Sequence, residues 1–432
     1  MMMKFRTMRS ALALGLALVA TPLMAQQIGF RDAVERALKF SGEMRLATAQ
    51  RTKATAGYRV ERSAYFPSIN FGVSPGYSYG VAVSVAGQVP SIFSVTHTQT
   101  VFNLAVIDSV RAAHSDTVAA AIEYSDRADQ TILDASLLYI ELDNERRQLD
   151  AARLQQQSLE HALYIAQQRQ KEGVASLLDI KRAELDLARA ELRVSQLEAS
   201  SGVAREKLAR MIGVSAATLE TDSASVPTAP ALRSEQDLSS AALANSRSVQ
   251  LADEHARAAR LRARAEHRVN YPSVNFSGQF AEFASYLNYG LTYTPTHNYS
   301  FAFNINIPLL NLSQNAKAAA ADAEAMRIEA EAKNTRDQVA AEAVRVQQAV
   351  RQLAAHAKVS RLEYEVAEAN IDDVARRIQD GQASAHDQEA AKAEVAAQQG
   401  LLLQSQFECL RAQLQLMRQT GELRDWALPD GK

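Results

Sequence analysis

The sequence of 432 residues has little cysteine, tryptophan or proline: one, one and ten residues of each. A single cysteine cannot form an internal disulfide, which excludes a disulfide scaffold. No proline occurs from 91 to 226 or from 309 to 428, so both stretches can form long helices. No run of about 18 apolar residues is present, which excludes a protein anchored by apolar helices. Charge is missing as well, because Tyr65 to Ile107 contains no Asp, Glu, Lys or Arg. A chain segregated in this way is not a string of ordinary globular domains.

The N-terminus has the pattern of an export signal. Lys4, Arg6 and Arg9 precede an apolar stretch at 11–20, and a cleavage site is expected after Ala25. Residues 1–25 are therefore predicted to be a secretory signal peptide. Its removal leaves 44 basic and 49 acidic residues without a basic patch, so no nucleic-acid partner is expected.

The remaining chain repeats itself. A shift of 205 residues places the segment 66–71 (FPSINF) on 271–276 (YPSVNF). Further along, the offset becomes 208 and pairs Gly173 with Gly381, Asp179 with Asp387, and Gly213 with Gly421. The three extra residues are expected in the aromatic segments between the two blocks. We predict a first repeat at 26–213, a linker at 214–233 and a second repeat at 234–432.

Each repeat contains a segment with the pattern of β-strands, about 66–102 in the first and about 271–308 in the second. From Ile69 to Val85 the odd positions are apolar except Pro75, while the even positions are Asn, Gly, Ser or Ala. This alternation predicts a strand with two unlike faces. A second strand is expected over 92–102, and the second repeat is expected to form strands over 273–286 and 299–307, joined by a turn at 295–298.

The strand faces favour a membrane location. One face is apolar and aromatic, and the other is small and uncharged, whereas a solvated sheet normally carries charged side chains. Strands of about 10 residues also suit a tilted bilayer crossing. A soluble β-sandwich is the alternative. Two hairpins supply only four strands, and the smallest closed membrane barrels have about eight. Open edges are not tolerated in lipid, so two or three chains would have to join.

The rest of the chain is predicted to be helical. Segments 103–172 and 311–380 lack Gly and Pro, and each could be a rod of about 100 Å. A helix that runs back along each rod is expected over 176–212 and over 384–420. These helices are shorter than the rods, and we expect shorter helices at 41–64 and 246–269, stacked end to end with them, to supply the missing length. The linker and the C-terminal tail would then lie partway along the rod. The helices are rich in alanine and polar residues, and an ordinary coiled coil is the alternative.

In this order, the motifs resemble the outer-membrane efflux family, the TolC-like channels, over essentially the whole mature chain. The residues that carry the resemblance are Phe66-Pro67-Ser68, Tyr271-Pro272-Ser273, Val101-Phe102-Asn103, Leu309-Leu310-Asn311 and the turns at 173–179 and 381–387. The resemblance implies a mostly α fold with a small β part: a homotrimer whose 12-stranded outer-membrane barrel continues into a 12-helix periplasmic tunnel. It also implies a passive exit duct of a tripartite efflux or type I secretion system, located in the outer membrane and extending into the periplasm. The partners would be a periplasmic adaptor, an inner-membrane pump or ABC transporter, and outer-membrane lipid.

The turns at 173–176 and 381–384 are the candidate sites. Ser176-x-x-Asp179 and Ser384-x-x-Asp387 are capping-box patterns, which by themselves explain these residues. The functional hypothesis is that Asp179 and Asp387 from several chains form rings that narrow the entrance and select or gate cations. Gly173, Ser176, Gly381 and Ser384 would contact the adaptor. Ala383 stands where well-known family members have a basic latch residue, so no gating salt bridge is inferred.

No catalytic or metal-binding pattern is present in the sequence. The eight histidines are scattered, and the G-x-S-x-G patterns at 72–76 and 76–80 lie inside a predicted strand rather than at a strand-to-helix turn. An enzyme, a cofactor and a metal site are therefore not expected. The alternative to an export duct is a periplasmic structural rod whose strands serve assembly rather than membrane insertion. The sequence does not identify the exported substrate.

Overall fold

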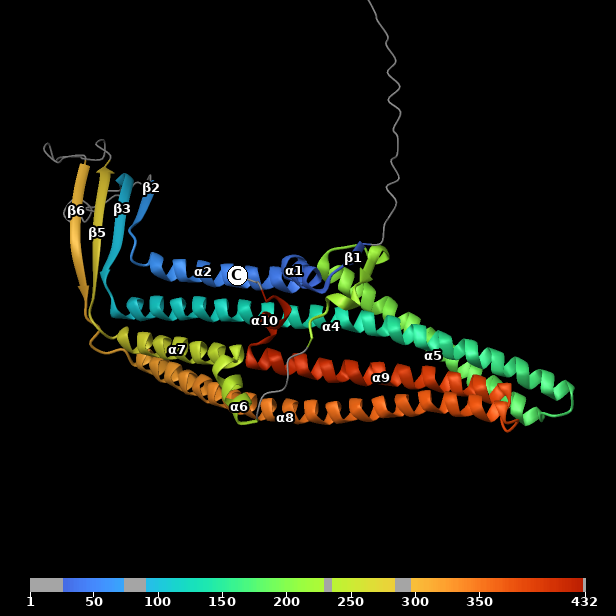
Figure 1. The fold of residues 1–432 in the computed structure, drawn as a ribbon. Helices are drawn as coiled ribbons and strands as arrows, with labels where there is room; N and C mark the ends of the chain where they lie inside the picture. Colours follow the sequence, from blue (N-terminus) through green and yellow to red (C-terminus); the bar gives the residue numbers. More distant parts are fainter. Residues whose placement is uncertain (1–25, 74–90, 229–234, 284–296, 430–432) are drawn as a thin grey trace, which may run out of the picture.

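A computed structural model describes residues 26–73, 91–228, 235–283 and 297–429. It shows a long helical rod with a four-stranded sheet at one end (Figure 1). The mostly α fold with a small β part is confirmed. The predicted signal peptide, the outer parts of both predicted hairpins and positions 229–233 of the predicted linker lie outside the described residues.

Two helices of 68 residues run the length of the rod, α4 (Leu104–Lys171) and α8 (Leu312–Gln379). The side chains of Asn103 and Asn311 cap their N-termini by accepting backbone N–H groups. Both helices end one residue before the predicted limits, and Gly173 and Gly381 follow with φ of 78° and 71°. Glycine adopts this left-handed conformation without the steric penalty of a side chain, which explains its place at both turns.

Shorter helices lie in pairs along the two long helices, α4 and α8. Helices α2 (Gly42–Ser63) and α5 (Leu177–Ile212) both pack on α4, and α7 (Arg247–Arg268) and α9 (Ala385–Thr420) both pack on α8 (Figure 1). The prediction that a short and a longer helix pack against each long helix is confirmed. Because α4 also packs on α7 and α9, it joins the two halves of the chain.

The sheet consists of β2 (Ser68–Val73), β3 (Ser91–Phe102), β5 (Ser273–Phe283) and β6 (His297–Asn306), all antiparallel in the order β2-β3-β5-β6. The expected turn at 295–298 was too long. His297 and Asn298 already belong to β6, because they pair with Glu282 and Ala281 and extend the ladder. The strand also ends one residue earlier than predicted, at Asn306.

The two halves of the described chain share a series of two helices, two strands and two further helices. The order is α1-α2-β2-β3-α4-α5 in the first half and α6-α7-β5-β6-α8-α9 in the second, where α1 spans Phe30–Phe40 and α6 spans Glu235–Asn245. The offset between them is 205 at Ser68 and Ser273, where β2 and β5 begin, and 208 at Asn103 and Asn311, which cap α4 and α8. The extra residues therefore lie in the strand region, as predicted. The residue limits of the repeats stay a prediction.

The main apolar core lies midway along the rod. Here α1 (Phe30–Phe40), β1 (Gln26–Ile28), β4 (Leu219–Thr221) and α10 (Leu423–Ala427) pack on α4, α5 and α9. The hydroxyl of Tyr139 donates to the carbonyl of Ile28 at 2.8 Å, and its ring meets that of Phe30 edge-on at 5.5 Å. Two 3-10 turns (Ala216–Thr218 and Ser223–Ser225) and α6 (Glu235–Asn245) complete the chain. The described parts of the linker (214–228) and of the C-terminal tail (421–429) thus lie partway along the rod, as predicted, but the sequence patterns had not located this core.

Within the described ranges, no helix is both long and apolar enough to cross a membrane.

Candidate functional site

The sheet has two faces of different chemistry, and the strand register assigns each residue to one of them. Ile69, His97 and Gly278 are paired across three strands, and Phe71, Val95 and Phe280 form the next row on the same face. This face, called the apolar face below, also carries Val73, Phe93, Gln99, Val274, Phe276, Glu282, His297, Tyr299, Phe301, Phe303 and Ile305. It is the face that the odd positions of the first strand had predicted.

The apolar face is exposed in the single chain and is lined with aromatic rings in contact. Phe301 is 73% exposed and Phe303 68% exposed, although large apolar side chains of this kind are normally covered. Phe280 contacts the rings of Tyr299 at 4.9 Å and Phe93 at 5.8 Å between centroids. The ring of Phe301 also covers Gly278, where an added Cβ would lie 3.1 Å from it. Such a surface is suited to lipid rather than to water.

The opposite face of the sheet is small and uncharged. It carries Ser68, Asn70, Gly72, Ser94, Thr96, Thr98, Thr100, Asn275, Ser277, Gln279, Ala281, Asn298, Ser300, Ala302 and Asn304. The hydroxyls of Ser68 and Thr98 are 2.6 Å apart, and Asn304 Nδ2 donates to Ser277 Oγ at 3.0 Å. These two pairs form hydrogen bonds across the strands, and all residues of this face except Ala281 remain at least partly accessible to water. We call this the polar face.

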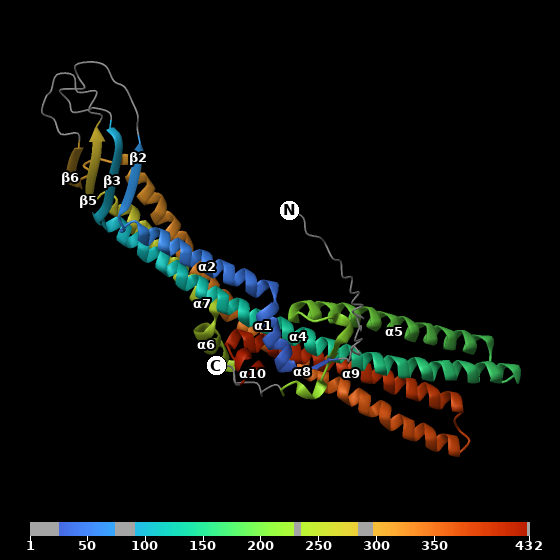
Figure 2. The ribbon, with the colours of Figure 1, turned by 90° about the horizontal axis from the view of Figure 1, so that it is seen from above.

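The two predicted turns lie at the end of the rod opposite the sheet (Figure 2). Ser176 accepts the N–H of Asp179 at 3.2 Å, while the N–H of Ser176 donates to Asp179 Oδ2 at 2.9 Å. Ser384 and Asp387 form the same reciprocal pair, with distances of 3.4 Å and 2.8 Å. Both capping boxes are therefore present, and each acidic side chain is already held by its own turn.

The electrostatic surroundings keep both carboxyls ionised. Hydrogen bonds from the hydroxyl and then the backbone N–H of Ser176 lower the pKa of Asp179 below its usual value. The pKa of Asp387 is also lowered, first by the N–H of Ser384 and further by the charges of His386 and Arg169. His386 contributes to the shift at both carboxyls, so the two turns lie within electrostatic range of each other. One chain therefore brings both predicted acidic residues to the same end of the rod.

The first turn also presents apolar side chains that the sequence interpretation had not singled out. Val174, Leu177 and Leu178 are 64%, 63% and 57% exposed. The corresponding positions of the second turn are Gln382, Ala385 and His386. The sequence contained a signal for these exposed side chains. The pattern Val-x-x-Leu-Leu spans the start of α5, where no neighbouring helix is expected to cover apolar residues.

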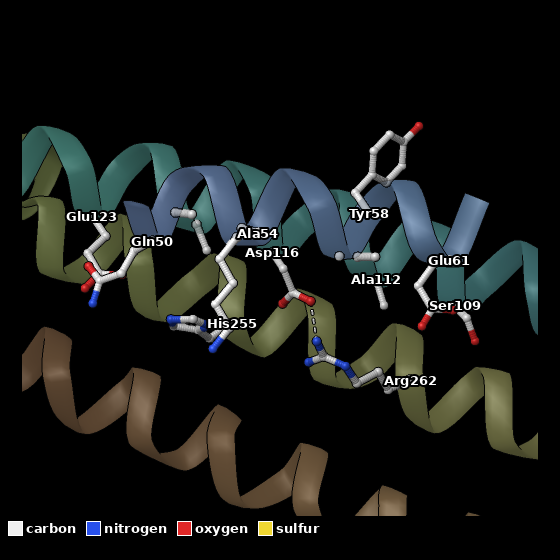
Figure 3. Close-up of a pocket in the computed structure, with 15 residues that line it drawn as sticks. Gln50, Ala54, Tyr58, Glu61, Ser109, Ala112, Asp116, Glu123, His255 and Arg262 are labelled. Atoms are coloured by element: carbon white, nitrogen blue, oxygen red, sulfur yellow. Dashed lines mark hydrogen bonds and ion pairs between the residues drawn. The ribbon is translucent and has the colours of Figure 1, made fainter. Parts of the chain in front are cut away.

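A groove of about 560 Å³ lies between α2 and α7, with α4 behind it in the view of Figure 3. Its floor includes Ala112, and its walls carry charges of both signs, with Arg262 paired to Asp116. Alanines allow the three helices to approach closely, and the charged side chains line the remaining space. Among the residues that the structure describes, no group of three or more His, Cys, Asp or Glu side chains could hold a metal ion.

The comparisons with known proteins agree with this geometry. Residues 33–214 match the sequence profile described as "Outer membrane efflux protein". A comparison with proteins of curated function finds no significant match.

Several solved structures have the same fold over most of their length. The chain is similar to CusC with a TM-score of 0.75 and 15% identity, covering 91% of this chain and 92% of that one. For the CmeC outer membrane channel of Campylobacter jejuni the TM-score is 0.73, with 12% identity and 91% and 86% of the two chains covered. For the open state of the MtrE outer membrane channel of Neisseria gonorrhoeae it is 0.68, with 17% identity and 93% of each chain covered. Residues 33–214 thus resemble the outer membrane efflux protein family, and the chain shares the fold of these outer membrane channels over most of its length.

Proposed function

We propose that this chain is one subunit of an outer-membrane exit duct that serves a tripartite efflux or type I secretion system. The observation that carries the proposal is the two-faced sheet at one end of the rod. Its apolar face is exposed and aromatic, and its polar face is uncharged and accessible to water. A sheet with these faces suits a barrel that has lipid outside and water inside. The helical rod would extend from that barrel into the periplasm.

The sheet is incomplete in a single chain. Within the described residues, strands β2 and β6 each have a partner on one side only, which leaves two open edges. Open edges in lipid are costly because backbone groups lose their hydrogen bonds. Three chains would close a barrel of 12 strands by pairing β6 of one chain with β2 of the next. The four helices side by side in each half of the rod would then form a 12-helix wall. The trimer is implied by family resemblance and is supported by these open edges.

The helix turns at the far end would form the periplasmic entrance. Asp179 and Asp387 remain charged through their capping hydrogen bonds, so rings of these residues would favour cations there. The exposed side chains of Val174, Leu177 and Leu178, next to Gly173 and Ser176, supply an apolar contact for a periplasmic adaptor. Gly381 and Ser384 shape the second turn beside it. An inner-membrane pump or ABC transporter would supply the energy, because the duct itself is passive.

Fractionation and conductance test the duct. The mature chain is expected in the outer-membrane fraction, extractable only with detergent, and to migrate as a trimer that heat dissociates. Reconstituted into planar bilayers, it should conduct ions. A water-soluble chain that stays out of the membrane fraction would support the structural-rod alternative, in which the strands serve assembly only.

Photo-crosslinking tests the adaptor contact. A crosslinking residue placed at Leu178 is expected to capture a periplasmic protein in cells. The same residue at Leu154, which is 56% exposed but far from the turn, is the matched control. Capture of the same protein with equal yield at both positions would contradict docking at the helix turns.

A further inference from the structure

The helix ends next to the sheet carry an excess of positive charge. In the ten helical residues nearest the strands, α7 has Arg260, Arg262, Arg264 and Arg268, and α2 has Arg59 and Arg62. Arg111 of α4 and Lys317 of α8 bring the total to eight basic residues against three acidic ones. At the opposite end of the rod, the same ten-residue windows of α4, α5, α8 and α9 hold seven basic and eight acidic residues. The excess is therefore local to the sheet end, in a chain whose acidic residues outnumber its basic ones.

Part of this charge is compensated by acidic residues farther along the helices. Arg262 forms an ion pair with Asp116, and Arg260 forms one with Glu329. Three of the other arginines, Arg111, Arg264 and Arg268, converge on a single carboxylate. Asp108 is fully buried between α4 and α7, and Arg264 donates to both of its oxygens at 2.8 Å and 2.9 Å.

Two more guanidinium groups complete this cluster. Arg268 lies 2.8 Å from Asp108 Oδ2, and Arg111 lies 3.5 Å from Asp108 Oδ1. One negative charge thus faces three positive charges. The side chains of Arg111 and Arg264 remain 60% and 47% exposed, so part of each guanidinium is free to bind a further anion. The planar guanidinium, with its several N–H donors, is well suited to phosphate.

The cluster lies at the border of the apolar face. Gln99 belongs to that face, and its Nε2 donates to the carbonyl of Tyr65 at 3.3 Å. The hydroxyl of Tyr65 reaches the carbonyl of Asn103, which caps α4 one turn before Asp108. Nearby, the guanidinium of Arg62 lies 5.8 Å from the ring centroid of Phe66, which is itself 58% exposed. Aromatic and basic side chains at this level are typical of a membrane–water interface.

The cluster also lies within the protomer rather than at its edge. It joins α4 to α7, whereas the open edges of the sheet, as far as the structure describes it, are β2 and β6. Oligomerisation through those edges would leave it uncovered.

We propose that the arginines around Asp108, together with Arg62, bind the phosphate of anionic phospholipid headgroups in the periplasmic leaflet of the outer membrane. This inference depends on the proposed membrane insertion of the sheet. Basic residues just outside a bilayer are attracted to anionic lipid, each by about fivefold in affinity. The bound lipids would fix the depth and orientation of the barrel, with the phosphate replacing water at the exposed sides of the guanidinium groups.

Lipid binding by the purified mature chain in neutral detergent tests the proposal. Fluorescent phosphatidylglycerol is expected to bind more tightly than fluorescent phosphatidylcholine in mixed micelles. Replacing Arg62→Gln together with Arg111→Gln should weaken phosphatidylglycerol binding by about fivefold per charge removed. These two arginines are chosen because Asp108 keeps its bonds from Arg264 and Arg268. The control Arg376→Gln with Arg377→Gln removes the same charge at the far end of α8 and should leave binding unchanged.

Three results would overturn the proposal: equal affinity for the two lipids, an equal loss in the control variant, or displacement of the lipid by millimolar inorganic phosphate. The last would identify a site for a free anion. Outer-membrane fractionation and bilayer conductance of the Arg62→Gln, Arg111→Gln variant are measured in parallel. If both are normal while the lipid preference is absent, the inference fails and the proposed function stands.

Discussion

Phe276 and Ser277 are neighbours in β5 and belong to opposite faces of the sheet, so the same substitution at each tests which face meets lipid. Phe276 pairs with Gln99 and Phe303 on the apolar face, and Ser277 pairs with Thr98 and Ala302 on the polar face. Both lie at nearly the same depth in the proposed barrel. Replacing each by lysine therefore adds the same charge at nearly the same depth, on opposite faces of the sheet.

The expected effects differ by about 2 kcal/mol. The ring of Phe276 lies 5.1 Å from that of Phe303 and 5.5 Å from that of His97, and each such aromatic contact contributes about 0.5–1.5 kcal/mol. Because Phe276 pairs with Gln99 near the periplasmic border of the sheet, a lysine facing lipid there adds up to about 1 kcal/mol. Phe276→Lys should therefore destabilise the barrel by roughly 2–3 kcal/mol. Ser277→Lys loses one exposed hydrogen bond from Asn304 and places its charge in water, at a cost of about 1 kcal/mol or less.

Outer-membrane assembly and channel selectivity provide the readouts. Phe276→Lys is expected to leave little chain assembled in the outer membrane. Ser277→Lys should assemble normally and shift the ion preference of the channel toward anions in planar bilayers. If Phe276→Lys assembled normally while Ser277→Lys did not, the assignment of the two faces would be wrong, and with it the proposed barrel.

Four further predictions concern the entrance and the stability of the rod. Asp179→Asn combined with Asp387→Asn should reduce the cation preference in planar bilayers, and unchanged selectivity would exclude a role at the entrance. Because both pKa values are lowered, the preference of the unchanged channel should persist below the usual carboxyl range and disappear only as the pH falls through these lowered values. Tyr139→Phe should lower the free energy of unfolding by about 2–4 kcal/mol, since the buried carbonyl of Ile28 and the partly buried N–H of Asp222 lose their partner at 2.8 Å each. Urea denaturation followed by circular dichroism measures this loss, and a change under about 1 kcal/mol would contradict the role of the hydroxyl. Gly213→Ala should be more destabilising than Gly381→Ala in the same assay. Both have a φ of 71°, but of the two only Gly213 would place the new Cβ 3.1 Å from an aromatic ring, that of Phe40. Equal losses of unfolding free energy would show that backbone strain alone accounts for the destabilisation.

The helix limits were predictable because their signals are local. Asn103 and Asn311 cap the long helices, and Gly173 and Gly381 follow their ends, so the bounds agree with the prediction to within a residue. Strand alternation around Ile69 likewise predicted which side chains share a face. The expected turn at 295–298 was wrong in part, since pairing with β5 extends β6 to His297. Pairing with another strand leaves no local mark in the sequence.

The central core and the arginine cluster could not be found in this way. The core brings together Phe30 of α1, Tyr139 of α4 and Trp426 of α10. These rings meet only because α1 and α10 fold back on α4. Asp108 and Arg264 are 156 residues apart, and each could have been one more solvated charge on a helix. Contacts of this kind depend on which helix faces which, and at what height along the rod.

The sequence by itself determined the elements of this protein and the chemistry of its strands. Helix length follows from the spacing of Gly and Pro, and the two unlike faces follow from a period of two, because both act through neighbouring residues of the chain. The tertiary structure decided how these elements meet. It placed β3 beside β5, brought both acidic turns to one end of the rod, and gathered the arginines around Asp108 at the other. Each of these arrangements depends on the register between segments far apart in the chain, and only packing and hydrogen bonding between them can set that register.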